Sequence, residues 1–419
     1  MAGLSTWTGK PWKSNGSHVN GNRVLPIVSI AGTRGKSTVS WMLSAILKAA
    51  NIPAASWLST GVYVEGERQE GELGPWSRVV LAARHGEIDV AVQEMNAATV
   101  VGAGLPKDTY PLAILTTLCG NNDACLLNSE TELQRRALNI VVDAVRNDGT
   151  IVANADDYDI AELANNTEAA QVLYALHREN PALQRHLAAG GYAAWIEDGQ
   201  IVTGTAGSTE VIVAVNEIPA TLDGTILFQI QNALAAVCAA QIIGAPATAI
   251  AGGLRSYEPD PEVQPAACNI VRFNSATILV DAPRQITSLR MLARGIKHKP
   301  RRRTLVVSGP FPGLNNDEDA QEAGRILGGL GGIVLLHGKS APPERMDAIK
   351  SGIAASPVPP IVLAVPDELR AIDHLLNTIA PDDVALVIAD DPETVLDHLW
   401  PAPQISIDAG KKPGMVERT

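Results

Sequence analysis

The sequence predicts an α/β protein with two domains, each built around a mostly parallel sheet. Short apolar runs alternate with helical patterns along most of the 419 residues, and this alternation is typical of βαβ units. Hydrophobic residues make up 46% of the chain but aromatic residues only 4%, so aliphatic side chains are expected to fill the core, as in buried parallel sheets. At roughly 100–200 residues per domain, this length accommodates two or three domains.

The chain begins with a polar segment and then a first strand–turn–helix unit. Residues 1–23 are rich in Gly, Ser, Asn and Lys without any period, so we expect a flexible segment there. An apolar run from Val24 ends at Gly32, and apolar residues then recur at helical spacing over 40–50. Gly244 is expected to cap a long helix at its C-terminus. Further strands are expected at 54–58, 88–93, 112–118 and 149–157, and further helices at 133–145 and 226–244.

Residues 256–267 contain three prolines and three acidic residues, which makes this segment the best candidate for a linker. The alternation of strands and helices restarts after it. Five strand-like runs are expected at 276–282, 302–309, 331–338, 359–365 and 384–391. We therefore expect one domain over 24–257, a second over 258–402 and a flexible tail over 403–419.

Composition excludes several classes of function. A formal net charge of −12 argues against a protein that binds nucleic acid through a basic surface. No apolar run approaches the roughly 18–20 residues of a membrane span, and the N-terminus lacks the apolar core of a signal peptide. Four cysteines do not make a disulfide framework in a chain of this length. The expected location is the cytoplasm.

The strongest local motif is GTRGKST, Gly32–Thr38, which lies between the first strand and the first helix. Glycines there let backbone N–H groups approach phosphate oxygens, and a helix N-terminus adds positive potential. Lys36 would contact the β- and γ-phosphates, and the hydroxyl of Ser37 or Thr38 would bind Mg²⁺. The alternatives are an ordinary glycine-containing turn and a P-loop kinase or NTPase, although Ile30 replaces the first glycine of a strict Walker A pattern. The predicted phosphate-binding residues are Gly32, Thr33, Arg34, Gly35, Lys36, Ser37 and Thr38.

This motif resembles the G-T-x-G-K-[ST] loop of the Mur ligase superfamily of ATP-dependent amide ligases, and the similarity extends over about 24–400. The chain is most similar to the poly-γ-glutamate synthase branch and to the C-terminal ligase half of cyanophycin synthetase. The resemblance implies a central P-loop ATPase domain and a C-terminal Rossmann-like domain. It also implies that the N-terminal UDP-substrate domain of the peptidoglycan enzymes is missing.

Further site residues are implied by the same resemblance. Glu94 matches a Mg²⁺-binding glutamate, and Ser59 and Thr60 match a loop near the γ-phosphate in which Thr60 would also bind the metal. Asn232, in FQIQNALAA (228–236), matches an asparagine that meets adenine, and Asp281 would lie near the ribose. Residues 152–157 match the family's V-x-N-A-D-D. The alternatives are a surface glutamate at a strand end for Glu94 and a solvent-facing helix residue for Asn232.

The sequence departs from the family pattern at positions expected to face the acceptor. Asp123 replaces the histidine of T-N-x-x-x-D-H, and we expect it to take a catalytic role. Ala267 replaces an arginine, and Arg284 replaces the histidine of D-Y-A-H-N-P. The lysine that many members carbamoylate would fall near Ala137.

The resemblance implies that ATP and Mg²⁺ activate a substrate carboxylate as an acyl phosphate, which an amine, such as an amino acid, then attacks between the two domains. Arg34, Arg284 and the basic run 297–303 could attract acidic substrates. The alternative is a non-catalytic nucleotide-binding partner protein, and a protein partner or homo-oligomer stays open. We expect no metal site at Cys119 and Cys125, and we expect His85 and His337 to be surface or loop residues.

Overall fold

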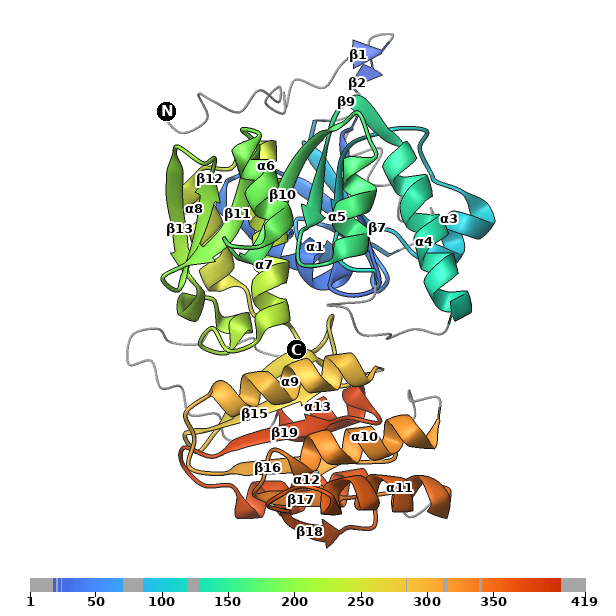
Figure 1. Ribbon diagram of the computed structural model, residues 1–419, viewed down its shortest axis with the longest axis vertical. Helices are drawn as coiled ribbons and strands as arrows, with labels where there is room; N and C mark the ends of the chain where they lie inside the picture. Colours follow the sequence, from blue (N-terminus) through green and yellow to red (C-terminus); the bar gives the residue numbers. More distant parts are fainter. Residues whose placement is uncertain are drawn as a thin grey trace. The chain divides into compact units, whose positions relative to one another are not determined.

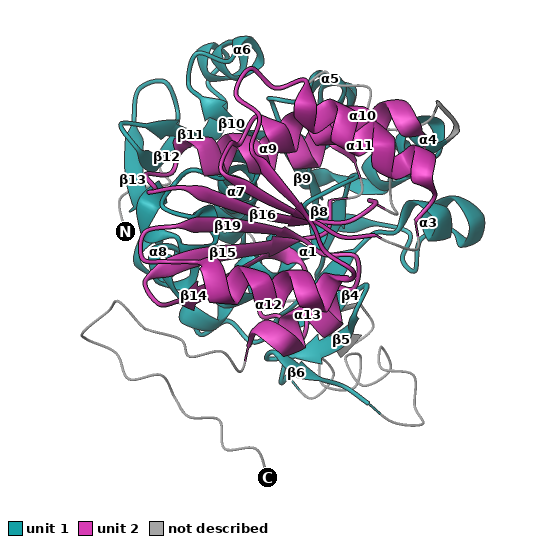
Figure 2. Ribbon diagram, turned by 90° about the horizontal axis from the view of Figure 1, so that it is seen from below, with its two compact units in different colours: residues 1–258 teal, residues 259–419 magenta. Residues whose placement is uncertain are grey.

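A computed structural model describes residues 18–19, 22–23, 25–70, 86–118, 128–283, 285–311, 316–338 and 341–400 of the chain (Figure 1). The protein divides into two compact units, residues 1–258 and 259–419 (Figure 2). Within the described residues, no helix is long and apolar enough to cross a membrane.

The first unit contains an 11-stranded sheet in the order β13-β12-β11-β10-β9-β8-β3-β7-β4-β5-β6. The seven strands from β11 to β4 run parallel, and antiparallel strands extend the sheet at both ends. The strands are β3 (Ile27–Ala31), β4 (Ala54–Leu58), β5 (Gly61–Val64), β6 (Glu67–Arg68), β7 (Val90–Glu94), β8 (Tyr110–Leu115), β9 (Val145–Asn154), β10 (Ala170–His177), β11 (Tyr192–Glu197), β12 (Gln200–Gly204) and β13 (Thr209–Ala214). A separate pair is formed by β1 (His18–Val19) and β2 (Asn22–Arg23).

Helices cover both faces of this sheet. One layer consists of α1 (Lys36–Ala49), α7 (Leu227–Ile243) and α8 (Ala247–Ser256). The other consists of α3 (Ala97–Ala103), α4 (Asn128–Asp143), α5 (Tyr158–Asn165) and α6 (Pro181–Ala188). Alternate residues of β3 reach the two cores, because Val28 and Ile30 pack toward the first layer and Ile27 toward the second. A central strand buried on both faces explains the unbroken apolar run in the sequence.

Helix α7 contains the Ala-rich stretch near the end of the first unit, and its burial on all sides accounts for this composition. Every residue from Gln229 to Ile243 is buried, so small side chains let neighbouring elements approach all around it. The prediction that Gly244 caps this helix is confirmed. Gly244 has φ 104°, and its amide donates to the carbonyls of Ala240 and Gln241.

The second unit contains a six-stranded sheet in the order β14-β15-β19-β16-β17-β18, in which only β14 is antiparallel. Its strands are β14 (Ala267–Phe273), β15 (Ala276–Asp281), β16 (Thr304–Ser308), β17 (Ile333–Leu336), β18 (Ile361–Ala364) and β19 (Val384–Ile388). Figure 2 shows α9 (Ile286–His298), α10 (Asp317–Gly328) and α11 (Pro343–Ala354) on one face, with α12 (Glu368–Thr378) and α13 (Pro392–Leu399) on the other. The predicted α/β class, with a large mostly parallel sheet and a second sheet, is confirmed.

Candidate functional site

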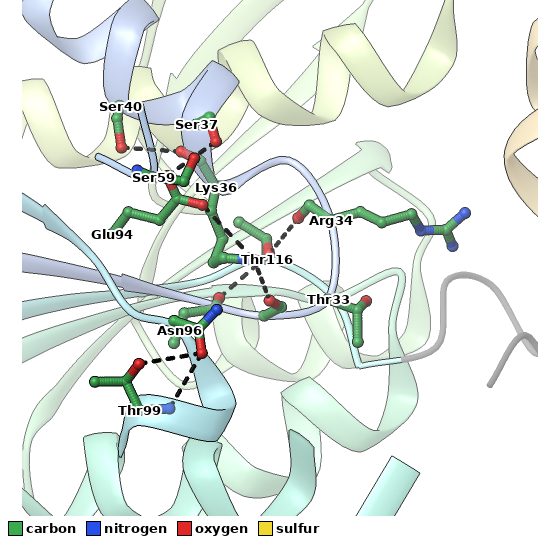
Figure 3. Close-up of polar contacts among 12 residues, drawn as sticks. Thr33, Arg34, Lys36, Ser37, Ser40, Ser59, Glu94, Asn96, Thr99 and Thr116 are labelled. Atoms are coloured by element: carbon green, nitrogen blue, oxygen red, sulfur yellow. Dashed lines mark hydrogen bonds and ion pairs between the residues drawn. The ribbon is translucent and has the colours of Figure 1, made fainter. Parts of the chain in front are cut away.

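The order of three parallel strands creates the site. Strand β3 lies between β7 and β8, with Ile30 paired to Glu94 and Ala31 paired to Leu115. The carboxyl ends of these strands therefore meet at one edge of the sheet, where ligands of open α/β sheets bind. The loop after β3, the end of β7 and the segment after β8 come together there (Figure 3).

Two glycines give the loop between β3 and α1 its shape. Gly32 has φ 138° and Gly35 has φ 82°, conformations that side chains with a Cβ rarely adopt. A Cβ on Gly32 would lie 2.1 Å from the Thr116 hydroxyl oxygen, so the loop also needs glycine for close packing. The sequence motif thus corresponds to a loop whose backbone conformation depends on glycine.

Helix α1 begins directly after this loop. Gly35 is its N-cap residue and offers no side chain to bond the first backbone N–H groups. Such groups, together with the helix dipole, favour an anion in front of the helix. The first turn also presents the side chains of Lys36, Ser37 and Thr38, and Thr38 is partly buried.

Lys36 folds back over its own loop. Its Nζ donates to the Gly32 carbonyl at 2.9 Å and lies 3.9 Å from Glu94 Oε1. Burial lowers the pKa of the Lys36 amino group below its usual value, and the charge of Glu94 opposes that shift. A cation held at the helix N-terminus is suited to binding phosphate.

Ser37 and Glu94 bring two oxygen ligands to the same point. The Ser37 hydroxyl donates to Glu94 Oε2 at 2.9 Å, and the backbone N–H of Ser59 donates to the same oxygen at 3.2 Å (Figure 3). A hydroxyl and a carboxylate are hard oxygen donors of the kind that Mg²⁺ prefers. Within the described ranges, no three His, Cys, Asp or Glu side chains form a metal-binding group.

Thr60 and Asp123 are the other metal-binding and catalytic candidates from the sequence. The Thr60 hydroxyl accepts a hydrogen bond from Tyr63 at 3.1 Å, so its assignment to the metal stays a prediction. Asp123 lies outside the described residues, as do Arg284, His85 and the pair Cys119 and Cys125.

Asn232 lies beside the loop and not on the solvent face of its helix. Its side chain donates to Gln229 Oε1 at 3.0 Å, and the residue is only 7% exposed. A Cβ on Gly35 would lie 2.3 Å from Asn232 Oδ1, so the amide packs against the N-cap of α1. The solvent-facing alternative is therefore excluded, while the contact with adenine stays a prediction.

Asp281 lies in the second unit, at the end of β15. Its Oδ2 accepts from the backbone N–H of Cys268 at 3.1 Å and from its thiol at 3.0 Å. Burial raises the pKa of Asp281 to about 6, although both of these hydrogen bonds lower it. Its predicted contact with a ribose stays a prediction.

Sequence reasoning missed the contacts that the segment after β8, residues 116–118, makes with the phosphate loop, and we call this segment the strap. The Thr116 hydroxyl donates to the Arg34 carbonyl at 2.7 Å and the Ala31 carbonyl at 3.2 Å. The Thr33 backbone N–H and hydroxyl bond to the Thr117 carbonyl at 2.7 and 3.1 Å. The sequence placed these residues inside a strand at 112–118, but β8 ends at Leu115, and Thr117 begins the segment compared with T-N-x-x-x-D-H.

The expectation of a surface or loop residue at His337 is correct for the loop, because His337 follows β17 outside any helix or strand, but not for the surface. His337 is 4% exposed and lies between carboxylates, with Nε2 at 3.9 Å from Glu368 and Nδ1 at 3.8 Å from Asp390. In the basic run 297–303, for which attraction of acidic substrates stays a prediction, two arginines bond a buried carboxylate. Arg302 and Arg303 each donate at 2.9 Å to the buried carboxylate of Asp383, because a charge there needs paired partners.

Comparison with known proteins agrees with this geometry. The sequence model of the Mur ligase middle domain matches residues 30–240. Cyanophycin synthetase of Synechocystis sp. is 26% identical over 379 residues, covering 88% of this chain and 43% of that protein. The chain thus spans less than half the length of the curated relatives that it matches first.

Solved structures share the fold. Folylpolyglutamate synthase from Thermotoga maritima has a TM-score of 0.61 at 14% identity, covering 90% of this chain and 89% of that one. A bifunctional folylpolyglutamate synthase/dihydrofolate synthase, solved with Mn, AMPPNP and L-glutamate bound, also has a TM-score of 0.61 at 14% identity. It covers 90% of this chain and 89% of that one.

Proposed function

Because this chain belongs to the Mur ligase family, we propose that it is an ATP-dependent ligase that joins a carboxylate to an amine. The observation that carries the proposal is the convergence of Lys36, Ser37 and Glu94 in front of helix α1. We assign ATP binding to residues 24–257, and we assign residues 258–402 to the C-terminal domain of the ligase.

The residues in front of α1 fit a nucleotide with a bound magnesium ion. The backbone N–H groups of the loop and Lys36 would hold the phosphates, while Ser37 and Glu94 would hold Mg²⁺. When bound, the metal would offset negative charge on the phosphate oxygens. The Lys36 amino group now bonds the Gly32 carbonyl and lies 3.9 Å from Glu94. To bind a phosphate, this amino group would exchange the Gly32 carbonyl for a phosphate oxygen.

The chemistry consists of two displacements. A carboxylate oxygen of the substrate attacks the γ-phosphorus of ATP, and the bond between that phosphorus and the β-phosphate oxygen breaks. ADP departs, and the substrate becomes an acyl phosphate. The amine nitrogen then attacks the acyl carbon, phosphate leaves, and the amine loses a proton. Lys36 stabilises the charge that develops on the transferred phosphoryl group, and exclusion of water protects the acyl phosphate.

The test is release of ADP and phosphate from ATP, measured against a panel of carboxylic acids and amino acids offered singly and in pairs. A ligase releases both products only when an acid and an amine are present together. Nucleotide binding without release under any pair would instead support the alternative, a non-catalytic nucleotide-binding partner, which the departures at Asp123, Ala267 and Arg284 motivate. Release that needs neither substrate would identify a simple NTPase.

A further inference from the structure

The strap, residues 116–118, connects the phosphate loop to a different part of the first unit. On one side, Thr116 and Thr117 hold the backbone of the loop from Ala31 to Arg34 through the hydrogen bonds described above. On the other side, the Leu118 backbone N–H donates to Asp157 Oδ2 at 2.8 Å. Leu118 and Asp157 are only 2% and 5% exposed, so solvent cannot replace this bond.

The topology explains how a residue more than a hundred positions away reaches the loop. Strands β3, β8 and β9 are parallel neighbours, with Ala31 paired to Leu115 and Leu115 paired to Ala153. Asp157 follows β9 and is the N-cap of α5, where its Oδ1 accepts from Ile160 N–H at 3.3 Å. One carboxylate therefore joins the start of a helix to the strap with its two oxygens.

We propose that Asp157 is a positioning residue for the nucleotide, acting through the strap on the phosphate loop. The inference rests on the proposed nucleotide site. A buried N–H that loses its acceptor remains unsatisfied, so the Leu118 backbone would move to find another partner. Because Thr116 and Thr117 share that backbone, the loop carbonyls and amides would lose their fixed position for phosphate.

The two oxygens of Asp157 allow its roles to be separated. In D157S the shorter hydroxyl can still cap α5 but cannot reach Leu118, whereas D157A removes both bonds. D367A removes the exposed N-cap of α12, which accepts from Arg370 N–H at 2.9 Å, and serves as a control for loss of a cap. All proteins are titrated with ATP by calorimetry, and their thermal unfolding is measured.

We expect D157S and D157A to bind ATP about tenfold more weakly than the wild type. D157S should keep more of the thermal stability than D157A. D367A should bind ATP as the wild type does. In turnover, KM for ATP should rise while kcat at saturating ATP is retained. Recovery of full ATP affinity in D157S would overturn the proposal, because Asp157 would then act only as a helix cap. Equal affinity in all variants would also overturn it. Failure of the wild type to bind ATP would instead refute the proposed function.

A second measurement covers the case in which a variant of Asp157 folds poorly. T116V keeps the side-chain shape but removes the hydroxyl that bonds Arg34 and Ala31. If Asp157 acts through the strap, the losses of ATP affinity in T116V and D157S should be less than additive in the double variant. Full additivity would show that the two residues act independently and would contradict the proposal.

Discussion

At the scale of single residues, the site depends on a small number of charged and hydroxyl groups held by backbone contacts. Lys36 lies between the carbonyl of Gly32 and the carboxylate of Glu94, and Ser37 shares that carboxylate. This arrangement holds a cation, a hydroxyl and a carboxylate together at the N-terminus of α1. Two substitutions test it separately.

Lys36→Ala should weaken ATP binding by about 2–5 kcal/mol, by analogy with truncating one member of a buried charged pair. Lys48→Ala, at the exposed end of the same helix, is the matched control and should leave affinity unchanged. Calorimetric titration of both variants is the measurement. An unchanged affinity in Lys36→Ala would mean that the phosphates bind elsewhere.

Glu94→Gln should abolish turnover at ordinary Mg²⁺ concentrations while leaving the fold intact. The amide can still accept the hydrogen bond from Ser37 but is a much weaker ligand for a hard cation. Rates measured over a range of Mg²⁺ concentrations should show partial recovery at high metal. Wild-type turnover at low metal would show that Glu94 does not bind the ion.

At the scale of elements, α4 lacks the lysine that many members of the family carbamoylate. We expect no carbamoylated lysine there, because the helix, Asn128–Asp143, contains no lysine and Ala137 is buried against the core. Its arginines cannot replace such a group, since a guanidinium stays protonated and offers no oxygen to a metal.

Activity should therefore be the same in buffer stripped of CO₂ and in buffer with added bicarbonate. The measurement is initial rate against bicarbonate concentration at fixed pH. Recovery of a stripped enzyme by bicarbonate would mean that the modified position lies somewhere other than Ala137.

At the scale of the whole molecule, the second unit should have a pH-dependent stability. Burial raises the pKa of Asp281 to about 6 from an ordinary value of 3.8, so the folded state binds more protons than the unfolded state between these values. The contribution of Asp281 to stability is therefore fully present below about pH 4 and is lost as pH rises through about 6. His337 and Asp390 have opposite shifts, to about 4 and about 6 because of burial, and largely offset each other.

Asp281→Asn should accordingly raise the free energy of unfolding by about 1–2 kcal/mol at pH 7 and change it little at pH 4. Urea unfolding of wild type and variant at both pH values is the measurement. A variant less stable than the wild type at pH 7 would show that the ionised carboxylate stabilises the fold through Cys268.

Sequence patterns predicted the elements that contain continuous apolar runs. These are the strands β3, β4, β7, β8, β9 and β15–β19 and the helix α7, while the glycine loop was predicted from its motif. The sequence did not predict β10–β13 or β14, because these strands mix polar and apolar residues and show no continuous apolar run. It also missed contacts that depend on folding, such as Arg302 with Asp383 and Thr116 with Arg34, because the partners lie about 80 residues apart.

The strap also bears on attempts to engineer this loop. Gly32 cannot accept a side chain while Thr116 lies against it, and the strap cannot shift while Asp157 bonds Leu118. A graft of residues 32–38 alone into another scaffold would bring the motif without the contacts that shape it. A transplant would have to carry three discontinuous pieces, which are the loop, the strap and Asp157. Random mutagenesis that rescues a damaged loop should likewise find its compensating changes in the strap or at Asp157.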